Sequence, residues 1–227
     1  MKPATLIIDG AEINCNEGDN LLWVALDNGF YIPHLCAMRD IDPPLASCRL
    51  CFVEIEGRNA PVTACTETVS NGMVIHLNTP KVERLRNTAF ELIISHHHLA
   101  CRSCAKNGSC ELQKIAAKTG FKLKLKRFRR IPKDFPIDSS HSSFSYDPNK
   151  CVLCGKCVWV CQEYGNEVLN FAFRGIDTVI STFNGIPFAE VKCNACMACV
   201  AVCPVGSLVA KPGVSLDEAK AIVAHRL

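Results

Sequence analysis

The sequence predicts an α+β protein built from small cysteine-rich domains, and three features lead to this prediction. Two apolar segments, residues 5–8 and 11–15, flank Asp9-Gly10, a dipeptide typical of tight β-hairpin loops, and residues 21–26 then follow a helix pattern. Residues 80–95 show a second helical periodicity, which predicts one buried face made of Val82, Leu85, Ala89, Leu92 and Ile93. The third feature is a set of sixteen cysteines, gathered mostly in short motifs. A hairpin followed by a helix suggests that the chain begins with a β-grasp domain.

The C-terminal part contains one cysteine pattern twice, C-x2-C-x2-C-x3-C, and the second copy ends in Pro204. This is the bacterial ferredoxin pattern, in which three thiolates bind one [4Fe–4S] cluster and the fourth reaches the other cluster. The pattern therefore predicts two such clusters. Their predicted ligands are Cys151, Cys154, Cys157 and Cys203 for one cluster and Cys161, Cys193, Cys196 and Cys199 for the other.

Zinc is the alternative for any single C-x2-C pair, because structural zinc sites use the same spacing. A zinc site has no need of a third cysteine and a displaced fourth, repeated twice. Disulfides would need an oxidising compartment. The N-terminus has no apolar region long enough for an export signal, and no apolar stretch approaches the roughly 18 residues of a membrane span. We therefore expect a cytoplasmic protein whose cysteines are metal ligands.

The formal charge of +3 is not an argument for nucleic-acid binding, since it counts every cysteine as neutral. Oxidised clusters with four thiolates carry roughly −2 each, and a cluster with one neutral His roughly −1. The two clusters above and two more that are predicted below, one of which has a His ligand, together lower the net charge to about −4.

A second set of cysteines has the spacing C-x11-C-x2-C-x13-C and consists of Cys36, Cys48, Cys51 and Cys65. Four thiolates suit a [2Fe–2S] cluster with two sulfurs on each iron. Residues 51–56 alternate like a half-buried strand, which places the central pair at its start. The x11 gap departs from the plant-type spacing, so zinc stays open on spacing alone.

A third group of ligands follows the helix predicted over residues 80–95. Cys101, Cys104 and Cys110 come just after three histidines, His96, His97 and His98. Three thiolates and one neutral imidazole could hold a third [4Fe–4S] cluster. A zinc site with one His and three Cys is the alternative, and the spacing alone does not choose among the histidines.

The segment 121–130 alternates apolar and basic residues, Phe-Lys-Leu-Lys-Leu-Lys-Arg-Phe-Arg-Arg. RNA is one possible target, but no stacking module or glycine-rich signature accompanies the segment. An alternating strand or extended arm with one wet basic face, lying on an acidic partner, is the preferred interpretation.

The remaining patterns give five predicted regions. Residues 131–145 look like a linker, residues 168–173 and 177–183 like short strands, and residues 214–225 like a terminal helix. The predicted regions are a β-grasp [2Fe–2S] domain over 1–78, a His/Cys3 [4Fe–4S] domain over 79–120, a basic arm and linker over 121–144, a ferredoxin-like 2[4Fe–4S] domain over 145–211, and a C-terminal tail over 212–227.

In this order, the motifs resemble the N-terminal electron-input region shared by the large iron–sulfur subunit of respiratory complex I, the [FeFe]-hydrogenases and the small diaphorase subunit of NAD-linked [NiFe]-hydrogenases. The resemblance covers residues 1 to about 210. Its most specific residues are Tyr31-Ile-Pro-His-Leu-Cys36, Cys48-Arg-Leu-Cys51, the His-x3-Cys-x2-Cys-x5-Cys block, Asn107-Gly-Ser-Cys110-Glu-Leu-Gln113, Cys157-Val-x-x-Cys161-x-Glu163 and Cys203-Pro-Val-Gly206.

This resemblance implies a [2Fe–2S] cluster despite the x11 gap, and it implies His97, Cys101, Cys104 and Cys110 as the ligands of the third [4Fe–4S] cluster. Fifteen of the sixteen cysteines then have a role. Cys15, in a predicted strand, is left as a small core residue.

The implied function is that of an electron-transfer subunit with one [2Fe–2S] and three [4Fe–4S] clusters and no catalytic residue of its own. Its expected partners are a flavin/NAD(P)-binding subunit and a catalytic subunit. The chain has no dinucleotide-binding, P-loop or flavin signature and no counterpart of the catalytic half of its longer relatives. By length it is most similar to the stand-alone subunit of an NAD-linked hydrogenase. The alternative is the same electron-transfer role in a formate dehydrogenase, an electron-bifurcating enzyme or another NADH-linked oxidoreductase. A zinc-stabilised binding protein is the remote alternative.

Overall fold

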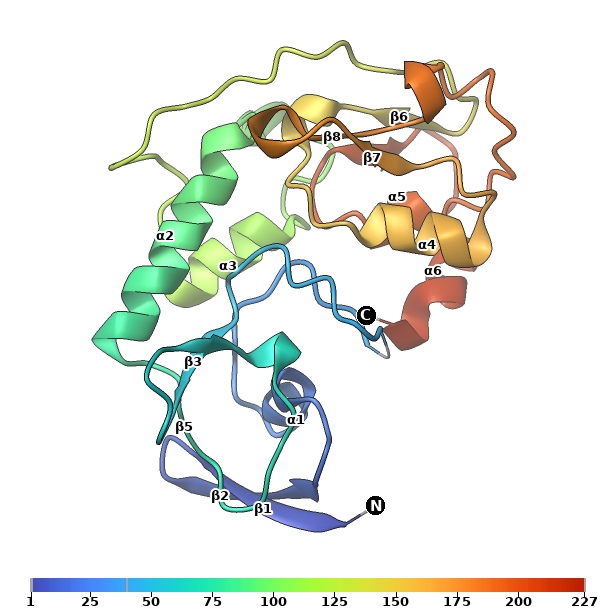
Figure 1. Ribbon diagram of the computed structural model, residues 1–227. Coiled ribbons are helices and arrows are strands. Elements are labelled where there is room, and N and C mark those ends of the chain that lie inside the picture. The colour runs from blue at the N-terminus through green and yellow to red at the C-terminus, as the bar shows by residue number, and fades with distance from the viewer. Residues whose placement is uncertain (1, 40, 227) are drawn as a thin grey trace. The chain divides into compact units, whose positions relative to one another are not determined.

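The computed structural model describes residues 2–39 and 41–226. The chain divides into two compact units, Met1–Phe90 and Glu91–Leu227. Both combine helices with short strands (Figure 1), in agreement with the predicted α+β class. The finer division into five regions stays a prediction.

The first unit is built on a five-stranded sheet in the order β2-β1-β5-β3-β4. β1 and β5 are parallel, and the other neighbouring strands are antiparallel. The core consists of apolar side chains from the sheet and from α1, among them Leu6, Leu22 and Ile75, each fully buried. The elements are β1 Pro3–Ile8, β2 Ala11–Asn16, α1 Leu21–Asp27, β3 Phe52–Ile55, β4 Val62–Thr63, the 3-10 turn η1 Ala64–Thr66 and β5 Val74–His76.

The predicted hairpin and helix are both present in this unit. Asp9 and Gly10 have φ values of 46° and 88°, the pair of positive values that a tight hairpin turn between β1 and β2 requires. Asn20 caps α1 by accepting a hydrogen bond from the backbone N–H of Leu22 at 3.1 Å. Cys15 is partly buried against this core, as expected of a small core residue.

Helix α2, Pro80–His96, begins where the sequence predicts, with Thr79 Oγ1 accepting from the N–H of Val82 at 3.2 Å. Its buried face agrees with the predicted one except at one position, since Val82 and Ala89 are buried and Leu85 and Ile93 are half-buried. Leu92, expected inside, is 47% exposed, whereas Arg86 and Glu91 are buried. Apolar periodicity misplaced Leu92 because two charged side chains with hydrogen-bond partners occupy inward positions of this helix.

The second unit has two small antiparallel ladders, β6 with β9 and β7 with β8. The first ladder joins the segment just before one ferredoxin motif to the segment just after the other. The elements are η2 Cys101–Ser103, α3 Glu111–Thr119, β6 Phe144–Tyr146, η3 Pro148–Lys150, α4 Lys156–Tyr164, β7 Asn170–Ala172, η4 Gly175–Asp177, β8 Val179–Ser181, η5 Phe183–Gly185, α5 Ala198–Val202, β9 Leu208–Ala210, α6 Asp217–Val223 and η6 Ala224–Arg226.

The segment between α3 and β6 has no helix or strand of its own and follows an extended course (Figure 1). The basic stretch 121–130 is therefore an arm rather than a strand. The two strands predicted between the ferredoxin motifs are present but shorter than expected, and the predicted terminal helix is α6. Within the described residues, no helix is long and apolar enough to cross a membrane.

Candidate metal centres

In the first unit, Cys36, Cys48, Cys51 and Cys65 lie together and are all buried. They form two pairs. The sulfurs of Cys36 and Cys48 are 3.4 Å apart, and the thiols of Cys51 and Cys65 are hydrogen-bonded to each other. The hydrogen bond with Cys48 lowers the pKa of Cys36 to about 5 and raises the pKa of Cys48, so one thiolate of this pair forms readily at neutral pH. Paired sulfurs suit an iron pair with two thiolates on each iron.

The loop before β3, the turn η1 and a side chain of α2 position three of these cysteines. Cys48 and Cys51 precede β3, and the residue between them with positive φ, Arg49 at 53°, allows the loop to turn back on itself. Cys65 lies on η1 directly after β4. Arg86 of α2 donates from Nε and Nη2 to the carbonyl oxygen of Phe52, at 2.9 and 2.6 Å, and so fixes the start of β3 next to Cys51. Burial lowers the pKa of Arg86 to about 10, which leaves it charged at neutral pH.

In the second unit, a small cavity is lined by Cys101, Cys104 and Cys110 together with His97 and His98. His97 is buried, whereas His98 is exposed and His96 does not line the cavity. The Nδ1 atom of His97 lies 2.8 Å from the carbonyl oxygen of Lys150, which can only accept a hydrogen bond. Nδ1 therefore carries the proton, and Nε2 keeps a free lone pair for a metal. Burial lowers the pKa of His97, which favours the neutral ring that ligation needs.

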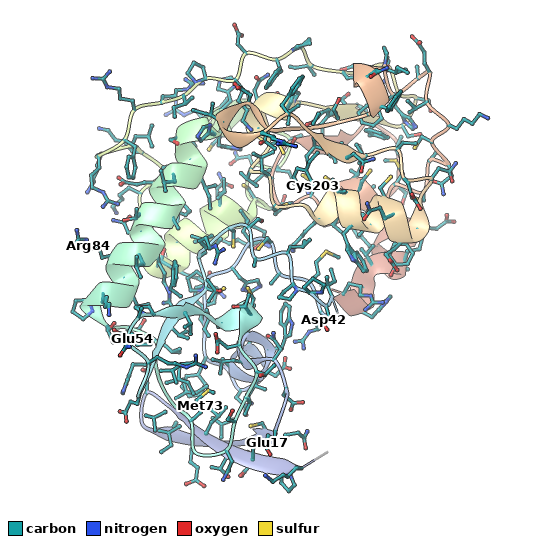
Figure 2. All side chains as sticks on the ribbon, in the orientation of Figure 1. Glu17, Asp42, Glu54, Met73, Arg84 and Cys203 are labelled. Carbon is teal, nitrogen blue, oxygen red and sulfur yellow. The ribbon has the colours of Figure 1, made fainter. Side chains whose placement is uncertain are left out.

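A second cavity is lined by the four thiols that the sequence assigns to one ferredoxin cluster, together with Tyr146 and Ile180. Cys203, which is labelled in Figure 2, follows directly after α5 at the end of the second motif. The hydroxyl of Tyr146 donates to the carbonyl oxygen of Ile180 at 2.6 Å, so its only proton is taken up away from the sulfurs. Burial raises the pKa of Cys151 to about 11 and also raises the pKa of Cys154 and of Cys157. The thiols lining this cavity are Cys151, Cys154, Cys157 and Cys203.

The four cysteines assigned to the other ferredoxin cluster lie close enough to one another for their charges to interact. Cys161, Cys193 and Cys196 each raise the pKa of Cys199, after the larger effect of burial. Cys193 and Cys196 are only half-buried, unlike the members of the other ferredoxin set. The centre that contains Cys193 and Cys196 is therefore more exposed than the one that contains Cys151.

The two ferredoxin motifs share one local conformation. Leu153 and Ala195 occupy the same place in the repeat, have φ values of 54° and 55°, and each directs its N–H at the first sulfur of its motif, at 3.4 Å. Gly155 and Met197 also have positive φ, and each precedes a helix, α4 or α5. Residues in the left-handed backbone conformation at these fixed places curve each loop around its proposed cluster site, at a small cost in backbone strain.

The members of each of the four predicted ligand sets lie in one region of the structure. Among the described residues, no three His, Cys, Asp or Glu side chains converge closely enough to hold one metal ion. In the second unit, two of the sets of thiols line cavities instead. All sixteen cysteines are free of disulfides.

Three contributions to these sites have no clear sequence signal. Tyr146 lines a cavity five residues before the motif starts, and the Lys150 carbonyl oxygen orients His97 from the backbone. Gly206 lies in the recognised Cys203-Pro-Val-Gly206 motif, but its role is visible only in three dimensions, because a Cβ atom there would overlap Cys104 Sγ. The described structure also fixes the loop by a hydrogen bond from the N–H of Glu111 to the carbonyl oxygen of Pro204, at 2.9 Å.

Comparison with known proteins finds iron–sulfur domains in both units. Residues 1–80 match the profile of a 2Fe-2S iron-sulfur cluster binding domain. Residues 86–123 match the NADH-ubiquinone oxidoreductase-G iron-sulfur binding region, and residues 143–165 match a 4Fe-4S binding domain.

Several curated proteins are similar over nearly the whole chain. The NADPH-Fe(3+) oxidoreductase subunit alpha of Geobacter sulfurreducens is 37% identical over 92% of this chain, which spans only 24% of that protein. The NAD-reducing hydrogenase HoxS subunit gamma of Cupriavidus necator is 31% identical over 91% of this chain and 86% of its own length. A chain in the crystal structure of an NAD+-reducing [NiFe]-hydrogenase in the H2-reduced state matches with a TM-score of 0.78 and 30% identity. That match covers 92% of this chain and 88% of the other.

Proposed function

The chain belongs to the family of the NAD-reducing hydrogenase HoxS subunit gamma, and from this membership we propose that it carries electrons between a flavin/NAD(P)-binding subunit and a catalytic subunit. The observation that carries the proposal is the gathering of fifteen cysteines and one buried histidine into four sets of metal-binding side chains. We assign no catalytic acid, base or nucleophile to this chain.

The donor sets fit iron–sulfur clusters. We assign one [2Fe–2S] cluster to the paired thiols of the first unit and three [4Fe–4S] clusters to the sets in the second unit. Bound clusters supply one-electron chemistry. The chain provides the thiolates, the neutral His97 ring oriented by Lys150, backbone N–H groups directed at sulfur, and burial from water.

Iron content tests the number of clusters. The four proposed clusters require about fourteen irons per chain. We expect the anaerobically reconstituted chain to hold this amount and to show visible charge-transfer absorption. A colourless protein with stoichiometric zinc would favour the zinc-stabilised alternative, and a much lower iron content would contradict the proposal.

The catalytic partner is proposed to be a hydrogenase, because a relative that this chain matches over 86% of that relative's length is a hydrogenase subunit. A cytoplasmic location agrees with sixteen cysteines without a disulfide. Electron paramagnetic resonance of the native complex, purified without oxygen, tests the partner. Signals from reduced clusters after addition of hydrogen alone would support a hydrogenase. Signals with NADH but not with hydrogen would instead favour formate dehydrogenase or another NADH-linked oxidoreductase.

A further inference from the structure

The basic arm, residues 121–130, presents a row of cations that the fold itself does not use. Lys122, Lys124, Lys126, Arg129 and Arg130 are all exposed, and the apolar residues between them are half-buried. Within the part of the chain that the structure describes, none of these five cations forms an ion pair with a carboxylate. Five unpaired charges in nine residues repel one another, so their clustering contributes nothing to stability.

The arm is nevertheless held in a defined position. Glu91 of α2, 3% exposed, accepts from the backbone N–H of Lys126 at 3.1 Å and from Arg127 Nε at 2.6 Å. The N–H of Ile131 donates to the carbonyl oxygen of Ser95 at 2.8 Å. A buried carboxylate is costly unless it is paired, so this anchor is a specific feature of the fold. It leaves the neighbouring cations pointing outward on a fixed backbone, which reduces the ordering cost of binding a partner.

The arm is also attached to two of the proposed cluster sites. It follows α3, whose N-cap is Cys110, and it leads to Lys133, whose Nζ donates to the carbonyl oxygen of Cys151 at 3.4 Å. Its anchor Ser95 is two residues before His97. A molecule bound on the arm therefore lies beside the part of the second unit that holds two [4Fe–4S] sites.

The chemistry of the arm favours one kind of partner. A permanent subunit interface has an apolar core in which lysine is depleted, but here the exposed side chains are basic and the apolar ones are half-buried. Single-stranded RNA needs exposed rings for base stacking, whereas Phe121 and Phe128 are half-buried. Long exposed cations suit a transient encounter steered by opposite charge. With its clusters bound the chain is negative overall, about −4, so the arm is a place where an acidic protein can approach without repulsion.

We propose that the basic arm is a transient docking site for a small acidic electron-carrier protein. The inference rests on the proposed function, because the encounter serves to pass one electron between that carrier and the iron–sulfur clusters of this chain. No bond forms or breaks. The carrier is reduced as a cluster of the chain is oxidised, or the carrier is oxidised as a cluster is reduced.

The test measures binding of an oxidised plant-type [2Fe–2S] ferredoxin, a small acidic carrier, to the anaerobically reconstituted chain between 20 and 300 mM salt, roughly 21 to 6 Å in screening length. The arm variant is Lys122→Glu/Lys124→Glu/Arg129→Glu. Its matched control, Arg84→Glu/Arg174→Glu/Lys220→Glu, changes three exposed cations elsewhere and alters the net charge equally. We expect the arm variant to associate about tenfold more slowly at low salt, and the control within about twofold of the wild type. Iron content and circular dichroism should be the same in all three proteins.

Three results would overturn the proposal. These are no binding of the ferredoxin at 20 mM salt, equal losses in the arm and control variants, or a 20-nucleotide oligouridylate that binds the arm more tightly than the ferredoxin does. A chain that holds about fourteen irons but fails this test refutes only the docking site. A chain that binds the ferredoxin but lacks the irons refutes the proposed electron-transfer function instead.

Discussion

His97 is the proposed ligand whose surroundings the structure defines most sharply. It is buried, and its Nδ1 is taken up by the Lys150 carbonyl oxygen, whereas His98 is exposed. We predict that His97→Cys retains a [4Fe–4S] cluster but lowers its reduction potential, because a charged thiolate replaces a neutral ring. A redox titration followed by electron paramagnetic resonance measures this shift. His98→Ala is the control and should leave the potential unchanged. A change in His98→Ala without one in His97→Cys would identify the other histidine as the ligand.

Gly206 is a second single-residue determinant. Its place against Cys104 leaves no room for a Cβ atom. Because the Pro204 carbonyl oxygen is bound to the N-terminal turn of α3, the loop has little freedom to move away. We predict that Gly206→Ala displaces Cys104 and removes one cluster, lowering the iron content from about fourteen to about ten per chain. Ala105→Ser, an exposed change of one heavy atom beside the same cysteine, should retain all the iron. Full iron content in Gly206→Ala would show that the loop can shift.

At the scale of elements, α2 and β3 are joined by a buried charge. Arg86→Met leaves the Phe52 carbonyl oxygen without its two donors, which costs roughly 1–3 kcal/mol of unfolding free energy. We expect a lower midpoint in chemical denaturation and a lower potential of the [2Fe–2S] cluster, since a positive charge near Cys51 is lost.

Two further variants separate these effects of Arg86. Arg86→Lys keeps the charge but only part of the hydrogen bonding, so it should restore the potential more than the stability. Arg58→Met removes an exposed arginine whose partner is Glu67 and should change little. An equal loss of stability in Arg58→Met and Arg86→Met would contradict the assigned role of the buried guanidinium.

The elements also show how far local sequence signals reach. The hairpin at Asp9-Gly10 and the start of α2 at Pro80 follow from backbone preferences of a few adjacent residues, and both were predicted. The cysteine spacings likewise group residues that the structure brings together, because loop lengths limit where sulfurs can converge. The buried face of α2 was wrong at Leu92, since it depends on a distant pairing of Glu91 with Arg127. A backbone carbonyl such as that of Lys150 has no signature in sequence at all.

At the scale of the whole molecule, most of the buried thiols favour the protonated state when no cluster is bound. Burial raises the pKa of Cys151 from 9.0 to about 11 and raises those of Cys154, Cys157 and Cys199 in the same direction. The folded cluster-free chain therefore holds protons that the unfolded chain has already lost above pH 9. This contribution to stability is fully present below about pH 9 and is lost as the pH rises towards 11.

Bound clusters reverse that dependence, because they hold the sulfurs as thiolates in the folded state. The unfolded chain then binds more protons, so the loaded protein loses stability as the pH falls below the ordinary thiol pKa of 9.0. We predict opposite pH slopes of the unfolding free energy, falling between pH 9 and 11 for the cluster-free chain and falling towards acid for the loaded chain. Urea denaturation under anaerobic conditions measures both. In the cluster-free chain, Cys151→Ala should flatten the alkaline slope, because it removes one buried thiol with a raised pKa. Parallel slopes for the two forms would mean that the buried thiols do not dominate the coupling between metal binding and folding.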